Sequence, residues 1–187
     1  DPFFLELSTF CKQHQLGVET LIHEAGAGQM EINFTHGDAL ELADRVFLFK
    51  RAVRETALRH GIFGTFMAKP METEPGSAMH IHQSILDAAT GNNIFSDKKG
   101  EPSPLFFNYI AGLERYTAAA TLLFAPHVNS YRRLSRFMSA PTNVHWGYDN
   151  RTCGFRIPNS TPINRRANWP TRRSLQPRRR DQCQPTA

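Results

Sequence analysis

The stretch HEAGAGQMEINF, from His23 to Phe34, carries the pattern that decides the local fold of this sequence. Apolar and polar residues alternate from Met30 to Phe34, and Glu31 lies on the polar side of the alternation. A period of two predicts a β-strand with one face in the core and the other face presenting a carboxylate. The rest of the stretch must be arranged around this half-buried strand.

A second carboxylate, Glu24, stands seven residues before Glu31. On one unbroken strand this odd spacing would send the two side chains to opposite faces. Gly26 and Gly28 remove that difficulty, because glycine lets the backbone turn or bulge between two strands. We therefore expect both carboxylates to converge on one point.

Another alternating segment runs from Ala78 to Ile85 and predicts a further strand, with His80, His82 and Ser84 on one face. Carboxylates beside a row of histidines suit a hard divalent cation, which prefers oxygen ligands and accompanies phosphate substrates. The alternative is that the carboxylates are solvated strand residues and the histidines are ordinary surface residues.

Helical periodicity and capping signals predict three helices around these strands. Their expected ranges are Pro2–His14, Asp38–His60 and Pro104–Phe124. Asp1 and Ser103 each precede a proline and are placed to begin a helix, and Gly61 is placed to end one.

Four more motifs follow the first stretch along the chain. They are FGTFMAKP (Phe63 to Pro70), PGSAMHIHQS (Pro75 to Ser84), NSYRRL (Asn129 to Leu134) and NRTCGFRIP (Asn150 to Pro158). With HEAGAGQMEINF, and in this order, they resemble the signatures of the glutamine synthetase catalytic domain over residues 17–166. Five ordered motifs are far more specific than any one of them.

This resemblance implies an α+β fold, with an antiparallel sheet backed by helices, in a partial catalytic domain over residues 1–166. It also implies an ATP-dependent ligase that phosphorylates the side chain of glutamate and then forms a γ-glutamyl amide with ammonia or an amine. Such phosphoryl transfer requires divalent cations, Mg²⁺ or Mn²⁺, and positive side chains that stabilise the charge in transit. Family members assemble into homo-oligomeric rings.

The resemblance also implies roles for single residues. Metal ligands would be Glu24 and Glu31 for one ion and His80 for the other; ATP contacts would be His82, Ser84, Arg156 and Arg166; glutamate or amine contacts would be Gly76, Arg133 and Ser139. The catalytic arginines would be Arg133, Arg151 and Arg156, because a guanidinium suits carboxylates and phosphates. Gln29 and Lys69 receive no role at this point.

The amine is indicated by the segment RFMSAP, which ends at Pro141. Ammonia-using members of the family have a glutamate where this chain has Ser139, and a hydroxyl weakens an ammonium site and leaves room for a larger amine. Asn143 to Thr152, NVHWGYDNRT, resembles members that glutamylate polyamines such as putrescine. An ammonia-using glutamine synthetase is the first alternative, and an inactive fragment or non-catalytic binding piece is another.

The sequence departs from the family pattern after Arg166. Asn168 stands where the family has a metal-binding glutamate, and Pro170 stands where it has a substrate-binding arginine. Residues 167–187 are rich in Arg, Pro and Gln and are expected to be an aberrant, disordered tail, as a frameshift would produce. The family's N-terminal β-grasp domain would precede Asp1 and is expected to be absent, so we expect this chain to form no complete ring and to have little activity.

Composition argues against two other classes of protein, membrane proteins and nucleic-acid-binding proteins. No apolar run in the 187 residues reaches the roughly 18 needed for a membrane span, and no leader pattern is present, so a cytoplasmic location is expected. The net charge of +5 suggests nucleic acid as a partner. Seven arginines lie after residue 164, however, and the rest of the chain is nearly neutral, so nucleic-acid binding is not favoured.

Overall fold

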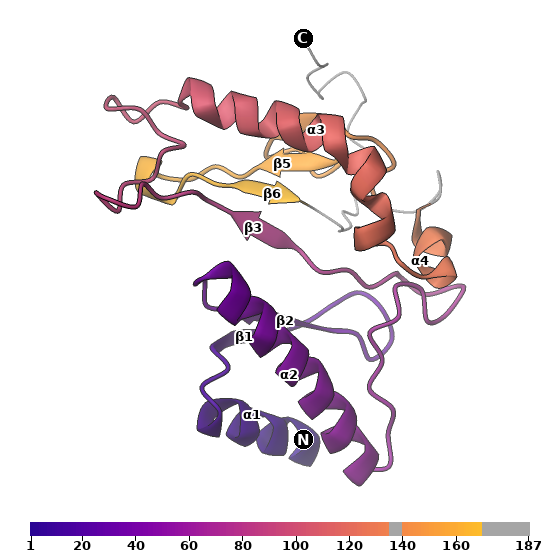
Figure 1. Ribbon diagram of the computed structural model, residues 1–187. Helices are drawn as coiled ribbons and strands as arrows, with labels where there is room; N and C mark the ends of the chain where they lie inside the picture. Colours follow the sequence, from indigo (N-terminus) through magenta and orange to yellow (C-terminus); the bar gives the residue numbers. More distant parts are fainter. Residues whose placement is uncertain (135–139, 170–187) are drawn as a thin grey trace. The chain divides into compact units, whose positions relative to one another are not determined.

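The structure is a computed structural model that describes residues 1–134 and 140–169 (Figure 1). The chain forms two compact units, Asp1–Ser77 and a second that begins at Ala78. The predicted tail beyond Trp169 lies outside the described residues. No helix in the described part is long and apolar enough to cross a membrane.

The first unit packs two helices against a two-stranded antiparallel sheet. In chain order its elements are α1 (Pro2–Gln13), β1 (Val18–His23), β2 (Met30–Phe34) and α2 (Ala39–Arg59). Both predicted helices and the strand Met30–Phe34 are confirmed. The Asp1 carboxylate accepts from the Phe3 amide at 2.9 Å, and that of Asp38 accepts from the Leu40 amide at 2.9 Å, so each helix begins at the predicted cap.

The core of this unit lies between the two helices and the sheet. Leu7 of α1 and Ala57 of α2 are buried, and Ile32 of β2 packs against the same cluster. Phe34 meets Phe49 edge to face, with ring centroids 5.2 Å apart. The apolar side of the β2 alternation therefore faces the core, as its sequence predicts.

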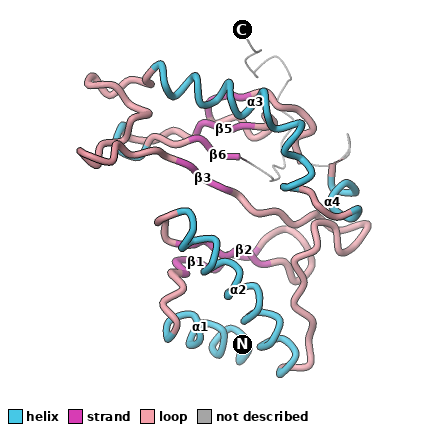
Figure 2. The backbone as a smooth tube through the Cα atoms, in the orientation of Figure 1, coloured by secondary structure: helices cyan, strands magenta, loops and turns pink. Residues whose placement is uncertain are grey.

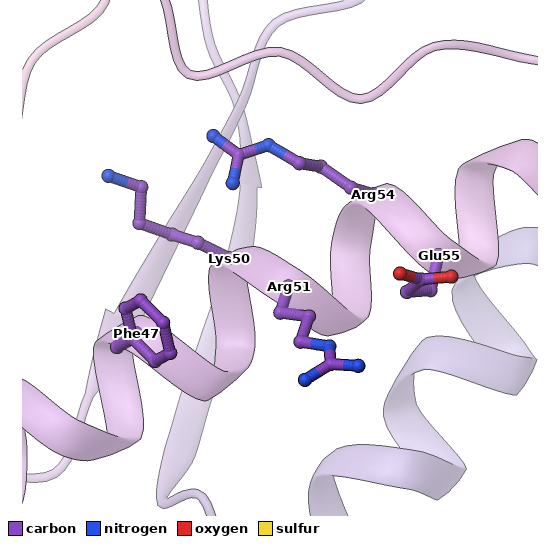
Figure 3. Close-up of a pocket in the computed structure, with 5 residues that line it drawn as sticks. All are labelled: Phe47, Lys50, Arg51, Arg54 and Glu55. Atoms are coloured by element: carbon purple, nitrogen blue, oxygen red, sulfur yellow. The ribbon is translucent and has the colours of Figure 1, made fainter.

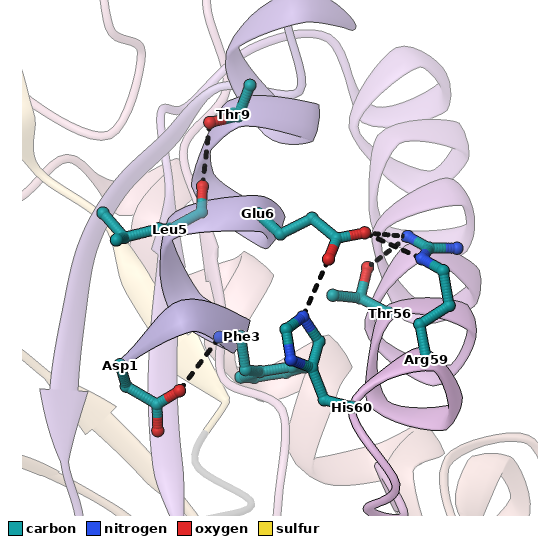
Figure 4. Close-up of polar contacts among 8 residues, drawn as sticks. All are labelled: Asp1, Phe3, Leu5, Glu6, Thr9, Thr56, Arg59 and His60. Atoms are coloured by element: carbon teal, nitrogen blue, oxygen red, sulfur yellow. Dashed lines mark hydrogen bonds and ion pairs between the residues drawn. The ribbon is translucent and has the colours of Figure 1, made fainter.

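A polar cluster joins the two helices at one end (Figure 4). Glu6 of α1 accepts from Arg59 Nε at 2.7 Å, and its other oxygen lies 2.7 Å from His60 Nε2. The hydrogen bonds from Arg59 and then His60 lower the pKa of the Glu6 carboxyl. The cluster ties the C-terminal end of α2 to the first two turns of α1.

The second unit contains a four-stranded sheet with a long helix on one face (Figure 2). Its elements are β3 (Ile81–Gln83), α3 (Pro104–Phe124), α4 (Val128–Arg133), β4 (Trp146–Tyr148), β5 (Phe155–Ile157), a 3₁₀ turn (Pro162–Asn164) and β6 (Ala167–Trp169). The strand order is β3-β6-β5-β4. Neighbouring strands are antiparallel except for β4 and β5, which are parallel.

Phe106 and Ile110 of α3 pack on Ile157 and Ala167 of the sheet to form the second core. Side chains alternate along a strand, so the residues next to these buried ones face away from α3. This opposite side, here called the site face, carries His82, Asn168 and Arg156.

Two sequence expectations differ from the structure in extent. The strand expected over 78–85 is only Ile81–Gln83 long. Residues 167–169, expected to belong to the tail, form β6 between β3 and β5, and Ala167 and Asn168 are buried at 1% and 2% exposure. The ordered body therefore extends past the composition change at Arg166, because main-chain pairing does not depend on which side chains a strand carries.

Candidate active site

The two hairpin carboxylates lie on one face, as predicted. Ile22 pairs with Glu31 in the antiparallel register, and the Glu24 amide donates to the Gln29 carbonyl at 2.9 Å. Paired residues share a face, and Glu24 lies two residues beyond Ile22, so Glu24 and Glu31 are diagonal neighbours on that face. Both are half-buried.

The reversal that allows this arrangement is a tight turn. The Gln29 amide donates to the Gly26 carbonyl at 3.0 Å, and Gly28 has a φ of +64°, in the left-handed region that favours glycine. The glycines therefore act as predicted: they reverse the chain into a hairpin, which cancels the odd spacing of the carboxylates.

Three strands align polar residues across the site face of the second unit. Asn168 on β6 pairs with His82 on β3 and with Arg156 on β5. Asn168 is 2% exposed, and its Oδ1 atom has no hydrogen-bond partner among the described residues. A buried amide oxygen without a partner is costly in a finished fold, so it indicates a position that a ligand or water completes.

His80 lies at the edge of this face. Burial lowers its pKa to about 4, with further lowering by the charges of His82, Arg156, Arg133 and Arg151. The ring is therefore neutral near pH 7, and its Nε2 atom is buried without a partner among the described residues. A neutral imidazole with an unpaired nitrogen fits the donor that a divalent metal ion requires.

His82 also has its pKa lowered to about 4, by burial and then by Arg166 and Arg156. It is the more exposed histidine, so solvent screens these effects more strongly than at His80. Near pH 7 both imidazoles are uncharged, and the positive charge of the site face comes from arginines.

The arginines reach the site face from separate segments. Arg133, at the end of α4, is 8% exposed, and burial lowers the pKa of its guanidinium. Arg156 lies on β5 and donates to Asp149 Oδ1 at 2.9 Å. Arg151 is exposed in the turn before β5, and the Nε atom of Arg166 is buried without a partner among the described residues. Together these cations suit an anionic ligand such as a polyphosphate or a carboxylate.

The remaining predicted residues are less informative. Ser84 is exposed just beyond β3, and Gly76 lies in the loop that ends the first unit. Ser139 lies outside the described residues. Glu24 and Glu31 belong to the first unit and His80 to the second; within residues 1–134 and 140–169, no group of three His, Cys, Asp or Glu side chains could hold a metal ion.

Sequence reasoning missed Asp149. Its carboxylate holds Arg156 and also accepts from the Asn159 amide at 3.2 Å. The residue has a φ of +44°, which is uncommon outside glycine. The available signal was a carboxylate in a short turn, seven residues before an arginine. This spacing indicates an ion pair only once β4 and β5 are known to be paired.

A hollow of about 420 Å³ lies elsewhere, along α2 (Figure 3). Its lining residues are Phe47, Lys50, Arg51, Arg54 and Glu55. None of these was a predicted site residue, and all lie on the helix rather than on the hairpin turn. The hollow is therefore a feature of the helix surface and not of the candidate site.

Comparison with known proteins gives the family. The profile of the family described as "Glutamine synthetase, catalytic domain" matches residues 1–171. The chain belongs to the glutamine synthetase catalytic-domain family.

Two of the similar proteins have an amine in their names, and a third is a glutamine synthetase. The chain is 44% identical over 149 residues to the gamma-glutamylputrescine synthetase PuuA of Escherichia coli, covering 79% of this chain and 31% of that protein. It is 39% identical over 153 residues to the glutamine synthetase of Pyrococcus abyssi, covering 82% and 34%. It is 35% identical over 153 residues to a glutamate–isopropylamine ligase of a Pseudomonas species, covering 81% and 33%.

The ligand-free structure of GmaS superposes with a TM-score of 0.78 at 32% identity, covering 92% of this chain and 39% of that one. The chain thus spans about a third of the length of the curated relatives that it matches.

Proposed function

We propose that the protein is an ATP-dependent glutamate–amine ligase that forms a γ-glutamyl amide by way of γ-glutamyl phosphate. The observation that carries this proposal is the convergence of neutral His80 with Arg133, Arg151 and Arg156, which come from four separate segments. Such a cationic face with an uncharged nitrogen donor suits phosphates accompanied by a divalent ion.

The roles proposed for single residues are those that the resemblance to the family implies. Glu24 and Glu31 would hold one Mg²⁺ or Mn²⁺ ion, and His80 would contribute to a second. Bound ions would neutralise the oxygens of the transferring phosphoryl group. Arg133 would bind the α-carboxylate of glutamate, Arg151 and Arg156 would stabilise the phosphates, and His82, Ser84 and Arg166 would contact ATP.

We infer that the amine is a polyamine. The support is Ser139 at the expected ammonium position, the segment Asn143–Thr152, and the similarity to a putrescine-using enzyme. The similarity to a Pyrococcus glutamine synthetase favours ammonia as the second candidate.

An amine panel tests the reaction. Phosphate release from ATP and glutamate is measured with putrescine, isopropylamine or ammonium as the acceptor. We expect putrescine to support the highest kcat/KM, and equal or faster turnover with ammonium would overturn the polyamine assignment. Phosphate release that does not depend on any amine would overturn the ligase assignment.

Binding is tested separately, because Asn168 and Pro170 predict weak turnover. ADP affinity is measured for Arg151→Ala and Arg156→Ala, with Arg132→Ala as the matched control, since Arg132 is exposed on α4 beside Arg133. We expect about tenfold weaker binding for the first two variants and no change for the control. Equal losses in all three would indicate a nonspecific charge effect.

A further inference from the structure

The tip of the β1–β2 hairpin is tied to the loop of residues 64–77 by two side chains that run in opposite directions. From the hairpin, Gln29 Nε2 donates to the Gly76 carbonyl at 3.1 Å. From the loop, Glu74 Oε2 accepts from the Ala27 amide at 3.0 Å. The two bonds form a reciprocal connection between segments almost fifty residues apart in the chain.

Both ends of the Gln29 amide are used. Its Oε1 atom accepts from the Gly26 amide at 3.1 Å, while its Nε2 atom donates to Gly76. A Cβ atom on Gly26 would lie 2.7 Å from this oxygen, so glycine at position 26 is what lets the Gln29 side chain fold back over the turn. The two bonds together fix the orientation of the amide.

The loop is held from its own side as well. Lys69, 6% exposed, donates from Nζ to the Glu74 carbonyl, and the Ser77 amide donates to the Ala68 carbonyl at 2.8 Å. The loop therefore closes on itself between Ala68 and Ser77. Gln29 is the hairpin side chain that reaches Gly76.

The Gln29 carbonyl also accepts from the backbone amide of Glu24, so Gln29 is paired directly with a residue that carries one of the hairpin carboxylates. We propose that Gln29 is a positioning residue that holds the Gly76 loop against the hairpin carrying Glu24 and Glu31. A cation bound by these carboxylates would then order the substrate loop through Gln29. The substrate and metal roles rest on the proposed function, whereas the connection itself rests only on the contacts within the first unit.

The test is amide hydrogen exchange of residues 68–77 in the Gln29→Glu variant. This variant keeps an acceptor for the Gly26 amide but replaces the donor to Gly76 by an oxygen. The hairpin turn and the bond between Ala27 and Glu74 are retained, and the bond from Gln29 to the loop is lost. We expect exchange in the loop to become about tenfold faster than in the wild type. Asn33→Asp is the matched control, because Asn33 bonds across the same hairpin to Thr20 and not to the loop.

A loop that exchanges at the same rate in Gln29→Glu and in the wild type, or that Asn33→Asp releases equally, would overturn the proposal.

Mn²⁺ distinguishes this inference from the proposed function. In the wild type we expect Mn²⁺ to slow exchange in both the hairpin and the loop, and in Gln29→Glu to slow it in the hairpin alone. If Mn²⁺ does not slow exchange in the wild type, the metal assignment is refuted. The comparison of loop exchange between Gln29→Glu and the wild type without metal still decides the role of Gln29. Equal slowing of the loop in both proteins refutes the coupling.

Discussion

Arg156 Nη2 donates to Asp149 Oδ1 at 2.9 Å, so the direction of this guanidinium on the site face is set by a carboxylate in the β4–β5 turn. Partial burial alone would raise the pKa of Asp149, but the bonds from Arg156 and the Asn159 amide, with the charges of Arg156 and Arg151, lower it overall. The carboxylate is therefore ionised near neutral pH, where it can pair with Arg156.

Replacing Asp149 should weaken anion binding without removing any cation. We expect Asp149→Ala to lower ADP affinity about tenfold, because Arg156 loses a charge-assisted bond that orients it. Asp149→Asn should lose less, since asparagine keeps an acceptor and tolerates a positive φ. ADP binding is measured by titration, with Asp44→Asn on α2 as the control. Tighter ADP binding in Asp149→Ala would contradict the orienting role, because it would mean that Asp149 only competes with the ligand for Arg156.

The turn that carries Arg151 depends on one glycine. A Cβ atom on Gly154 would lie 2.1 Å from the Asn143 carbonyl oxygen, which belongs to the backbone and cannot move aside cheaply. Gly154→Ala should therefore destabilise the protein by about 3 kcal/mol. Gly112→Ala is the control. Apart from the adjoining backbone of α3, no atom of the described residues lies within 4 Å of the added carbon, and in the middle of α3 the change should stabilise by up to about 1 kcal/mol. Urea denaturation of both variants measures the difference, and equal stabilities would refute the steric argument.

Local signals in the sequence predict the elements of this fold well. The boundaries of α3 are those expected, and Met30–Phe34 is a strand, because capping and periodicity act over a few residues. The parallel pairing of β4 with β5 and the central place of β6 could not be foreseen, because they depend on contacts between distant segments.

The same limit applies to the candidate site. Motif order indicated which arginines and histidines to consider, but not that Asn168 would lie between His82 and Arg156. Asn168 was interpreted only as a lost ligand, whereas the strand register makes it the centre of the polar row. The role of Gln29 was equally invisible, because the loop that it holds is far away in the sequence.

The polar cluster between α1 and α2 should give the first unit an acid-sensitive stability. The pKa of Glu6 is lowered by Arg59 and then His60, so the folded state binds fewer protons than the unfolded state. This contribution is fully present above the unfolded pKa of about 4.3 and is lost as the pH falls through the lower folded value. Glu6→Gln should thus be less stable than the wild type at pH 7 and approach its stability below pH 4, whereas Glu55→Gln should follow the wild type throughout. The stabilities are measured by urea denaturation across this pH range. Parallel pH profiles for Glu6→Gln and the wild type would contradict the ion pair.

Divalent-ion binding by the hairpin is the most direct test of the first metal assignment. Glu24 and Glu31 share one face across the hairpin, so they can supply oxygens to the same ion, and removing one charge should weaken Mn²⁺ binding by about tenfold or more. Glu19→Gln is a matched control, because Glu19 is an exposed carboxylate on the same strand, β1, near the opposite end of the hairpin. Mn²⁺ affinity is measured by electron paramagnetic resonance for Glu24→Gln, Glu31→Gln and Glu19→Gln. Losses confined to the first two variants support a shared ion at the turn, whereas a similar loss in Glu19→Gln would mean that Mn²⁺ senses only the net charge of the hairpin.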